Sequence, residues 1–149
     1  MSEHLATVEW RSDGHFRDGR YSRVHDIAFD GGAEVKGSAS PDNVPVPMAD
    51  PAGVDPEEML VAATASCHML WFLHMARDAG FAVASYRDEA RGVMGKLDGR
   101  TAVKRIQLRP EIAFDGEAPD PETLARLHHE AHERCFIANS LKSEVVVGE

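Results

Sequence analysis

The chain has 149 residues, of which 43% are hydrophobic and 28% are charged, and its formal net charge is −9 at pH 7. This length predicts a single domain over residues 1–149, and this composition is typical of a globular protein with a core. The negative charge argues against binding to nucleic acid or to an anionic membrane surface, because their phosphates would repel the chain.

The first third of the chain predicts short β strands joined by turns. Residues 5–11 alternate between apolar and polar side chains and are followed by a turn that ends at Gly14. Further strands are expected at residues 21–29 and 33–38. Residues 40–54 contain four prolines, which predict a loop that is long enough to cover a site.

A long helix is predicted from Asp55 to about Gly80. Asp55 is a good N-cap, Pro56 suits the first turn and Glu58 completes a capping box, while Gly80 is a typical helix end. The middle of this segment is apolar on nearly all sides, which predicts burial on most of them. Its apolar run, residues 59–73, has 15 residues, fewer than the about 20 that span a membrane. The N-terminus also lacks the apolar run of a signal peptide, so we expect a cytoplasmic protein.

A β hairpin is predicted in the middle of the chain. Strands are expected at residues 86–97 and 101–114, on either side of Asp98-Gly99, which is a strong signal for a two-residue hairpin turn. Most strand connections would then be hairpins. We therefore expect antiparallel strands.

A second helix is predicted to start at Asp120, where Asp-Pro-Glu repeats the start of the first helix. Its apolar residues recur at helical spacing and place Cys135 on the buried stripe. Residues 136–142 either continue this helix or form a short second one, and residues 143–149 predict a final strand. The order of elements predicts the α+β class, with antiparallel sheets and a long helix.

The two cysteines of the chain, Cys67 and Cys135, lie in the two predicted helices. In a cytoplasmic protein such a pair is more often catalytic, redox-active or metal-binding than a structural disulfide. The alternative is that both are small core side chains, since free cysteine is among the most buried residue types. A thiol on an apolar helix face has a raised pKa and needs a nearby cation to become reactive.

The arginines of one early segment are the candidates for that cation: Arg17, Arg20 and Arg23. A buried guanidinium would need a carboxylate partner, for which Glu57 is the candidate. Glu57 and Cys67 are ten residues apart, about 15 Å along a straight helix, so they cannot meet within one helix. We therefore expect a homodimer in which the carboxylate of one chain serves the thiol of the other.

Three segments of this sequence resemble the OsmC/Ohr family, the osmotically inducible protein C and organic hydroperoxide resistance proteins. They are DPEEML at residues 55–60, Ala-Ser-Cys at 65–67, and Cys135 followed by SLKSEV at 140–145. The similarity extends from about residue 10 to 147. It implies an intertwined α+β homodimer with long central helices and sites at the interface. It also implies a cysteine-based, thiol-dependent peroxidase that reduces organic hydroperoxides with a dithiol reductant, such as a lipoyl group, and without a metal or other cofactor.

The same resemblance implies roles for individual residues. Cys67 corresponds to the peroxidatic thiol and Cys135 to the thiol that resolves it. Arg17, in an Arg-Asp-Gly turn, corresponds best to the family arginine, and Glu57 to the glutamate that holds it. Residues 135–138 read Cys-Phe-Ile-Ala where many members have Cys-Pro-Val-Ser, which leaves the subtype open.

The surroundings of the peroxide are expected to be apolar and to favour alkyl or lipid hydroperoxides over hydrogen peroxide. Arg20 is the second choice for the activating arginine. The candidate wall residues are Met59, Met69, Trp71, Phe72 and Phe136, although the same residues are most simply core.

Two other readings remain open at this stage. His128, His132 and Cys135 share one helix face and have spacing that can bind zinc, but ordinary surface histidines are favoured and His129 is expected to face solvent. The thiols also suit a non-catalytic module that senses redox state or binds a small apolar ligand.

Overall fold

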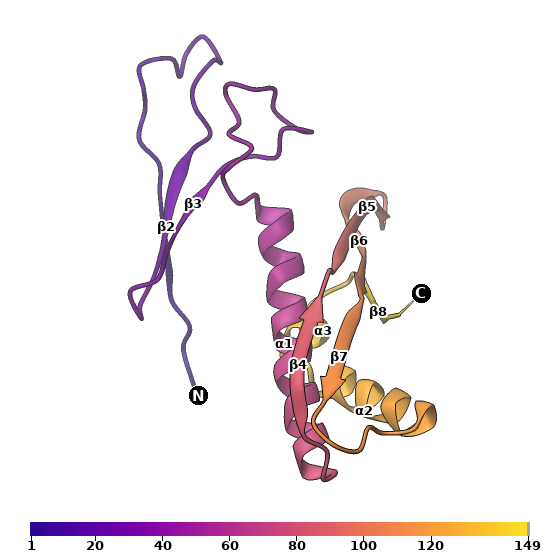
Figure 1. Ribbon diagram of the computed structural model, residues 1–149. Helices are drawn as coiled ribbons and strands as arrows, with labels where there is room; N and C mark the ends of the chain where they lie inside the picture. The colour runs from indigo at the N-terminus through magenta and orange to yellow at the C-terminus, as the bar shows by residue number, and fades with distance from the viewer. Residues whose placement is uncertain (149) are drawn as a thin grey trace. The chain divides into compact units, whose positions relative to one another are not determined.

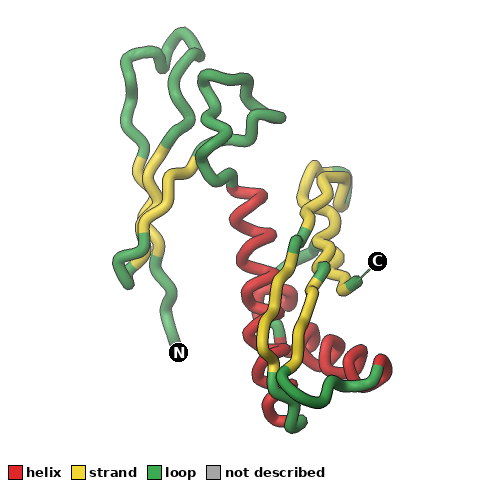
Figure 2. The backbone as a smooth tube through the Cα atoms, viewed as in Figure 1, coloured by secondary structure: helices red, strands yellow, loops and turns green. Residues whose placement is uncertain are grey.

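The computed structural model describes residues 1–148, and the chain divides into two compact units, Met1–Met59 and Leu60–Glu149. Figure 1 and Figure 2 show helices together with several small sheets, which is the α+β class that the sequence predicts. The expectation of one domain over residues 1–149 stays a prediction.

The unit Met1–Met59 contains one antiparallel sheet in the order β1-β2-β3. Its strands are β1 (Ala6–Glu9), β2 (His25–Phe29) and β3 (Glu34–Gly37). The second strand begins later than expected, because the backbone N–H of Ser22 donates to the Asp13 side chain and that of Arg23 to the Met48 carbonyl. These bonds hold the start of the predicted strand in a loop.

Few hydrophobic side chains of the unit Met1–Met59 are buried within the single chain. Ile27 and Ala49 are its only buried hydrophobic residues among those that the structure describes, whereas Leu5, Val8 and Phe16 are more than half exposed. Residues 40–54 form the predicted loop, which Ser38 anchors through a bond from the Asp50 backbone N–H to its hydroxyl, 2.9 Å long. The sheet therefore lacks a core of its own.

The long helix α1 spans Pro56–Asp78, and its start confirms the predicted capping box. The backbone N–H of Glu58 donates to the Asp55 carboxylate over 2.7 Å, and the backbone N–H of Asp55 donates back to the Glu58 carboxylate over 3.0 Å. Gly80 follows the helix with φ of 89°, a left-handed conformation that glycine adopts without strain. Local chemistry thus sets both helix ends.

The expectation that α1 is buried on most sides is wrong within one chain. Leu70 is 60% exposed, because the sheets of its unit cover one face only. By length and composition alone α1 would be able to cross a membrane, yet one face packs in a core. The buried residues form a single stripe at helical spacing: Thr64, His68, Phe72, Met75 and Ala76.

Each of the two long strands expected after α1 is broken into two. Arg109 is the point of separation: its backbone N–H donates to the Asp88 side chain over 2.7 Å instead of joining a ladder, and Pro110 has no N–H to contribute. The chain therefore changes sheet here. The four strands are β4 (Val83–Asp88), β5 (Arg91–Leu97), β6 (Arg100–Leu108) and β7 (Pro110–Phe114).

The pairing of these strands confirms the predicted hairpin and corrects the rest. Strands β5 and β6 are antiparallel around Asp98 and Gly99, both with positive φ, as a primed hairpin turn requires. Strands β4 and β7 form a separate antiparallel pair. The last strand, β8 (Glu144–Val147), pairs parallel to β6, so the prediction of antiparallel strands throughout is wrong. A helical crossover, not a hairpin, leads to β8.

Helix α2 spans Pro121–Arg134 and begins as predicted, with the Asp120 carboxylate accepting the Thr123 backbone N–H over 2.7 Å. Cys135 does not lie within α2, which corrects the expectation. It ends α2 and caps the short helix α3 (Phe136–Ser140), whose Ala138 N–H donates to the Cys135 sulfur over 3.4 Å. Cys135 is nevertheless fully buried.

The core of the unit Leu60–Glu149 has two parts. Figure 1 shows α1 beside β4 and β7, with α2 crossing near its C-terminal end. Phe72 and Met75 of α1 pack there with Leu127 and Ala131 of α2 against the β4–β7 pair. The second part lies where α1 meets β6 and β8, around Val103, Ile106 and Leu108. Both parts hold α1 in place along the length that carries Cys67.

Candidate functional site

The structure brings the two cysteines together from separate elements. Cys67 of α1 is half-buried and Cys135, between α2 and α3, is fully buried, and both are free thiols. Burial raises the pKa of the Cys135 thiol to about 11, and the contact with the neighbouring Cys67 thiol adds to this shift. Two sulfurs far apart in sequence therefore share one site.

The different surroundings of the two thiols distinguish their chemistry. A thiol with a pKa of about 11 stays protonated at neutral pH, so Cys135 is a poor first nucleophile. Cys67 is the more accessible of the two sulfurs. An attack on a substrate that enters from solvent is therefore expected to begin at Cys67.

Two aromatic side chains that follow the cysteines closely in the chain contact each other. Trp71, one turn after Cys67, meets the ring of Phe136 edge to face at 5.5 Å, and Phe136 is 68% exposed. Among the other expected wall residues, Met59 and Met69 are half-buried. Phe72 is fully buried in the core, so it does not line an open site.

One cation near this aromatic pair was not anticipated. The guanidinium carbon of Arg134 lies 5.8 Å from the centre of the Trp71 ring, within the range of a cation–π contact. Its position directly before Cys135 in the chain was the available sequence signal.

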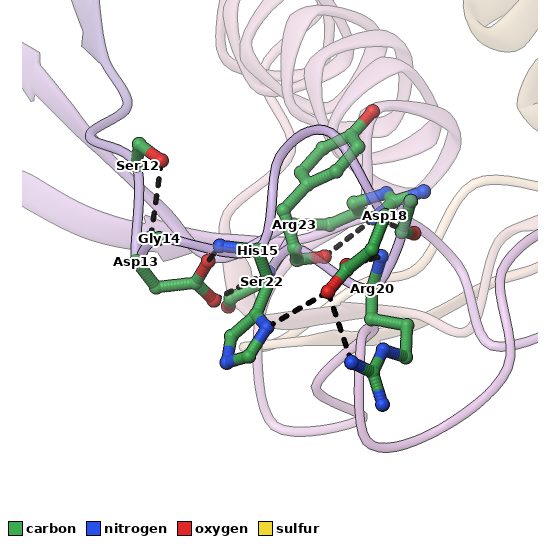
Figure 3. A network of polar contacts seen from close by, with 10 residues as sticks. Ser12, Asp13, Gly14, His15, Asp18, Arg20, Ser22 and Arg23 are labelled. Atoms are coloured by element: carbon green, nitrogen blue, oxygen red, sulfur yellow. Dashed lines mark hydrogen bonds and ion pairs between the residues drawn. The ribbon is translucent and has the colours of Figure 1, made fainter.

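The predicted arginines belong to the unit Met1–Met59, whereas both cysteines belong to the other unit. Figure 3 shows Arg20 bound to Asp18 over 2.9 Å, a pair that lowers the pKa of Asp18 to about 2. Arg23 lies over the Tyr21 ring at 3.4 Å. Arg17 is exposed, and no ion pair of residues 1–148 involves it. Of the three arginines, Arg17 is thus the one with neither an ion pair nor a cation–π contact within residues 1–148.

Glu57, in the first turn of α1, has an unusual environment for a carboxylate. Its Oε2 atom is shielded from solvent and accepts no hydrogen bond from the residues that the structure describes. A buried polar atom without a partner is costly, and nearly all such atoms in folded proteins are satisfied. The geometry therefore provides an acceptor for a donor from elsewhere.

His68, which follows Cys67 in α1, is buried and pairs with the half-buried His128 of α2. The Nε2 atom of His68 and the Nδ1 atom of His128 are 3.0 Å apart, and the two rings stack. Burial lowers the pKa of each imidazole to about 4, so both are neutral at pH 7. The expectation that His128 is an ordinary surface residue is wrong, because α2 packs this face onto α1; His129 is exposed, as expected. Within residues 1–148 no cluster of three His, Cys, Asp or Glu side chains is arranged to hold a metal ion.

Sequence comparison relates residues 49–149 to the family of OsmC-like proteins. The peroxiredoxin OsmC of Escherichia coli K12 is 30% identical over 95 residues, which are 64% of this chain and 65% of that protein. The matched region thus covers slightly less than two thirds of that relative. The uncharacterized protein YmaD of Bacillus subtilis is 26% identical over 106 residues, 69% of this chain and 71% of that protein.

Structural comparison gives the same relationship over nearly the whole chain. An OsmC-like protein of unknown function from Vibrio cholerae superimposes with a TM-score of 0.96 at 49% identity, covering 99% of both chains. An organic hydroperoxide resistance protein from Elizabethkingia anophelis superimposes with a TM-score of 0.71 at 16% identity, covering 99% of this chain and 93% of that one. At this identity the second match shows the fold alone. Both confirm the predicted α+β architecture.

Proposed function

Because the chain belongs to the OsmC-like protein family, which includes a peroxiredoxin, we propose that it is a thiol peroxidase that reduces organic hydroperoxides. One observation carries this proposal: a half-buried thiol, Cys67, lies near enough to a buried thiol, Cys135, to raise its pKa further, and Cys135 stays protonated at neutral pH. A peroxidase that uses two cysteines needs one sulfur to meet the peroxide and a second to resolve the product.

The reaction begins at Cys67. Its thiolate attacks the outer oxygen of the hydroperoxide, the O–O bond breaks, and the alkoxide leaves and takes up a proton to become an alcohol. Cys67 is then a sulfenic acid. The sulfur of Cys135 attacks it, which forms the Cys67–Cys135 disulfide and releases water. An external dithiol, such as a lipoyl group, restores both thiols by exchange.

The raised pKa of Cys135 suits the resolving role. A buried, protonated thiol does not compete for peroxide, and its proton leaves with the hydroxyl of the sulfenic acid as water when the disulfide forms. The apolar surroundings made by Trp71 and Phe136, with Met59 as a further candidate, favour an organic peroxide over hydrogen peroxide.

We assign activation of Cys67 to Arg17, held by Glu57, with Arg20 as the less favoured alternative. The unsatisfied Oε2 atom of Glu57 supports a donor from outside the described chain. The exposed face of α1 and the uncovered sheet of the first unit support a homodimer, in which a second copy would cover both. The net charge of −9 disfavours nucleic acid and membrane partners. We place the protein in the cytoplasm, where dithiol reductants keep such cysteines reduced.

A turnover measurement tests this function directly. Purified protein is mixed with cumene hydroperoxide and dihydrolipoamide, and the loss of peroxide is followed. We expect many peroxide molecules to be reduced per protein. A single stoichiometric oxidation would support instead a module that senses redox state.

Replacing Cys135 with serine is expected to stop the cycle after its first step. Cys67 would still be oxidised, but no disulfide would form, so sulfenic acid would accumulate at Cys67. Mass spectrometry after dimedone trapping measures this species, and the wild-type protein, which should form the disulfide, is the control. Undiminished cycling of Cys135→Ser with a monothiol would show that Cys135 is not an obligatory resolver.

Replacing Arg17 with glutamine is expected to slow alkylation of Cys67 by iodoacetamide roughly tenfold or more at neutral pH. Removing an adjacent positive charge disfavours the thiolate, which is the form that iodoacetamide alkylates. Arg20→Gln is the matched control, because Arg20 already pairs with Asp18 in its own loop. An unchanged pH profile of alkylation in Arg17→Gln, with a slower rate in Arg20→Gln, would transfer the role to Arg20.

A further inference from the structure

A pocket lies in the unit Leu60–Glu149, and neither cysteine lines it. It has a volume of about 680 Å³, within the range of small-molecule sites. Its walls come from the segment after β6, from one face of α2 along most of its length and from the end of β8. Its lining residues include Arg109, Leu124, His128, His132, Val145 and Val147.

The pocket is lined by apolar and basic side chains. Its floor and walls are largely apolar, with two prolines, a leucine and two valines, while its polar side chains are one arginine and three histidines. No Asp or Glu of the described residues lines it, although the chain carries a net charge of −9. The ion pairs formed within residues 1–148 do not include Arg109. The nearby Glu89 is bonded to Arg87, which lowers the pKa of Glu89 most, and the charge of Arg109 adds a smaller effect, so no carboxylate is bonded to the Arg109 guanidinium.

The buried histidine pair adds a hydrogen-bond donor to this wall. His68 is 1% exposed, and its Nδ1 atom has no partner among the described residues. If His128 donated to His68, the Nδ1 of His68 would carry a buried, unpaired N–H, which is the rarer and costlier kind of unsatisfied group. We therefore assign the donor to His68 Nε2. The proton of His128 then resides on Nε2, as its remaining donor in the pocket that it lines.

A further polar atom in this region also lacks a partner. The Nδ1 atom of His132, one turn after His128 on α2, is shielded and unbonded within residues 1–148. This atom is shielded, so the donors that the pocket offers to a ligand are the guanidinium of Arg109 and the Nε2 atom of His128, set among apolar walls. Such a combination matches a ligand with a polar head and a hydrocarbon body.

We propose that this pocket binds a small organic monocarboxylate, with the carboxylate at Arg109 and His128 and the apolar body along Leu124, Val145 and Val147. A carboxylate matches the fork of a guanidinium. An inorganic anion would leave the apolar walls unused, and a doubly charged phosphate would lack a second fixed cation, because His128 is neutral at pH 7. This binding site is separate from the proposed peroxidase reaction and does not depend on it.

Calorimetric titration of the full-length protein with octanoate tests the proposal. Octanol and octylamine have the same chain length without the negative charge, and inorganic phosphate supplies an anion without an apolar body. Octanoate is expected to bind at least tenfold more tightly than any of the three. Equal binding of octylamine, or no octanoate binding at millimolar concentration, would overturn the proposal.

Two substitutions locate the binding. Arg109→Gln and Ala125→Glu are each expected to weaken octanoate binding at least tenfold, the first by removing the cation and the second by adding a negative charge at an exposed position that lines the pocket. Arg100→Gln, at the opposite end of β6, is the matched control and should bind like the wild type. Turnover of cumene hydroperoxide should be unchanged in all three variants. Octanoate binding that both substitutions leave intact, or that cumene hydroperoxide displaces competitively, would place the ligand elsewhere and contradict the assignment.

Discussion

Replacing Cys67 with serine is expected to abolish peroxide turnover, by a factor of about a thousand or more. A hydroxyl has nearly the shape of a thiol but cannot form a nucleophilic anion at neutral pH. Cys135 cannot take over, because with a pKa of about 11 it holds only about one thiolate in ten thousand molecules at pH 7. The remaining sulfur is also fully buried, away from an incoming peroxide.

The measurement is the loss of cumene hydroperoxide with dihydrolipoamide as the reductant, with wild-type and Cys135→Ser proteins assayed at the same concentration. Equal melting temperatures of the three proteins would show that serine leaves the fold intact. Turnover that persists in Cys67→Ser and disappears in Cys135→Ser would reverse the two roles. Turnover that survives in both variants would mean that the thiols do not carry the reaction.

Acidification from pH 6.5 to pH 4 is expected to lower the free energy of unfolding, with His68 alone contributing on the order of 3 kcal/mol. Burial and the neighbouring imidazoles lower the pKa of His68 from 6.5 to about 4, and burial does the same for His128. Below pH 6.5 the unfolded chain binds protons that the folded pair excludes. The stability that the neutral pair contributes is therefore complete above pH 6.5 and is lost as the pH falls toward 4.

Urea unfolding at a series of pH values and one protein concentration measures this loss. The fixed concentration matters because the stability of the proposed homodimer would depend on it. His68→Phe should show a shallower decline with acid than the wild type, since one of the two proton-binding sites is gone. His74→Gln is the control, because His74 lies on the exposed side of α1 and its removal leaves the pair intact. A decline in His68→Phe as steep as that of the wild type would contradict the assignment.

The mixed outcome for the strands shows what local sequence controls. The hairpin at Asp98-Gly99 was predictable because two consecutive positive φ angles select particular residues in the turn itself. The break between β6 and β7 was not, because it depends on the Arg109 N–H finding the Asp88 carboxylate across the sheet. The alternation of apolar and polar side chains continues through such a break, so the periodicity of the sequence alone does not reveal it.

The candidate site divides in a similar way. The cysteines, the glutamate and the early arginines were visible as residue types in a suggestive pattern, and the proximity of the two thiols gives the cysteines a shared location. The roles of Arg17 and Glu57 remain predictions, because they depend on a second copy of the chain. Arg134 and the His68–His128 pair were missed, since no spacing rule connects α1 to α2.

By itself the sequence determined the α+β class, both ends of α1, the start of α2 and the hairpin turn, because caps and turns are satisfied by groups within a few residues of one another. Only the tertiary structure decided the parallel pairing of β8, the position of Cys135 between two helices, its proximity to Cys67 and the pairing of His68 with His128. Those features depend on which surfaces of distant segments pack against one another and exclude water. That choice is made by packing across the whole unit and is not encoded in any short stretch of the chain.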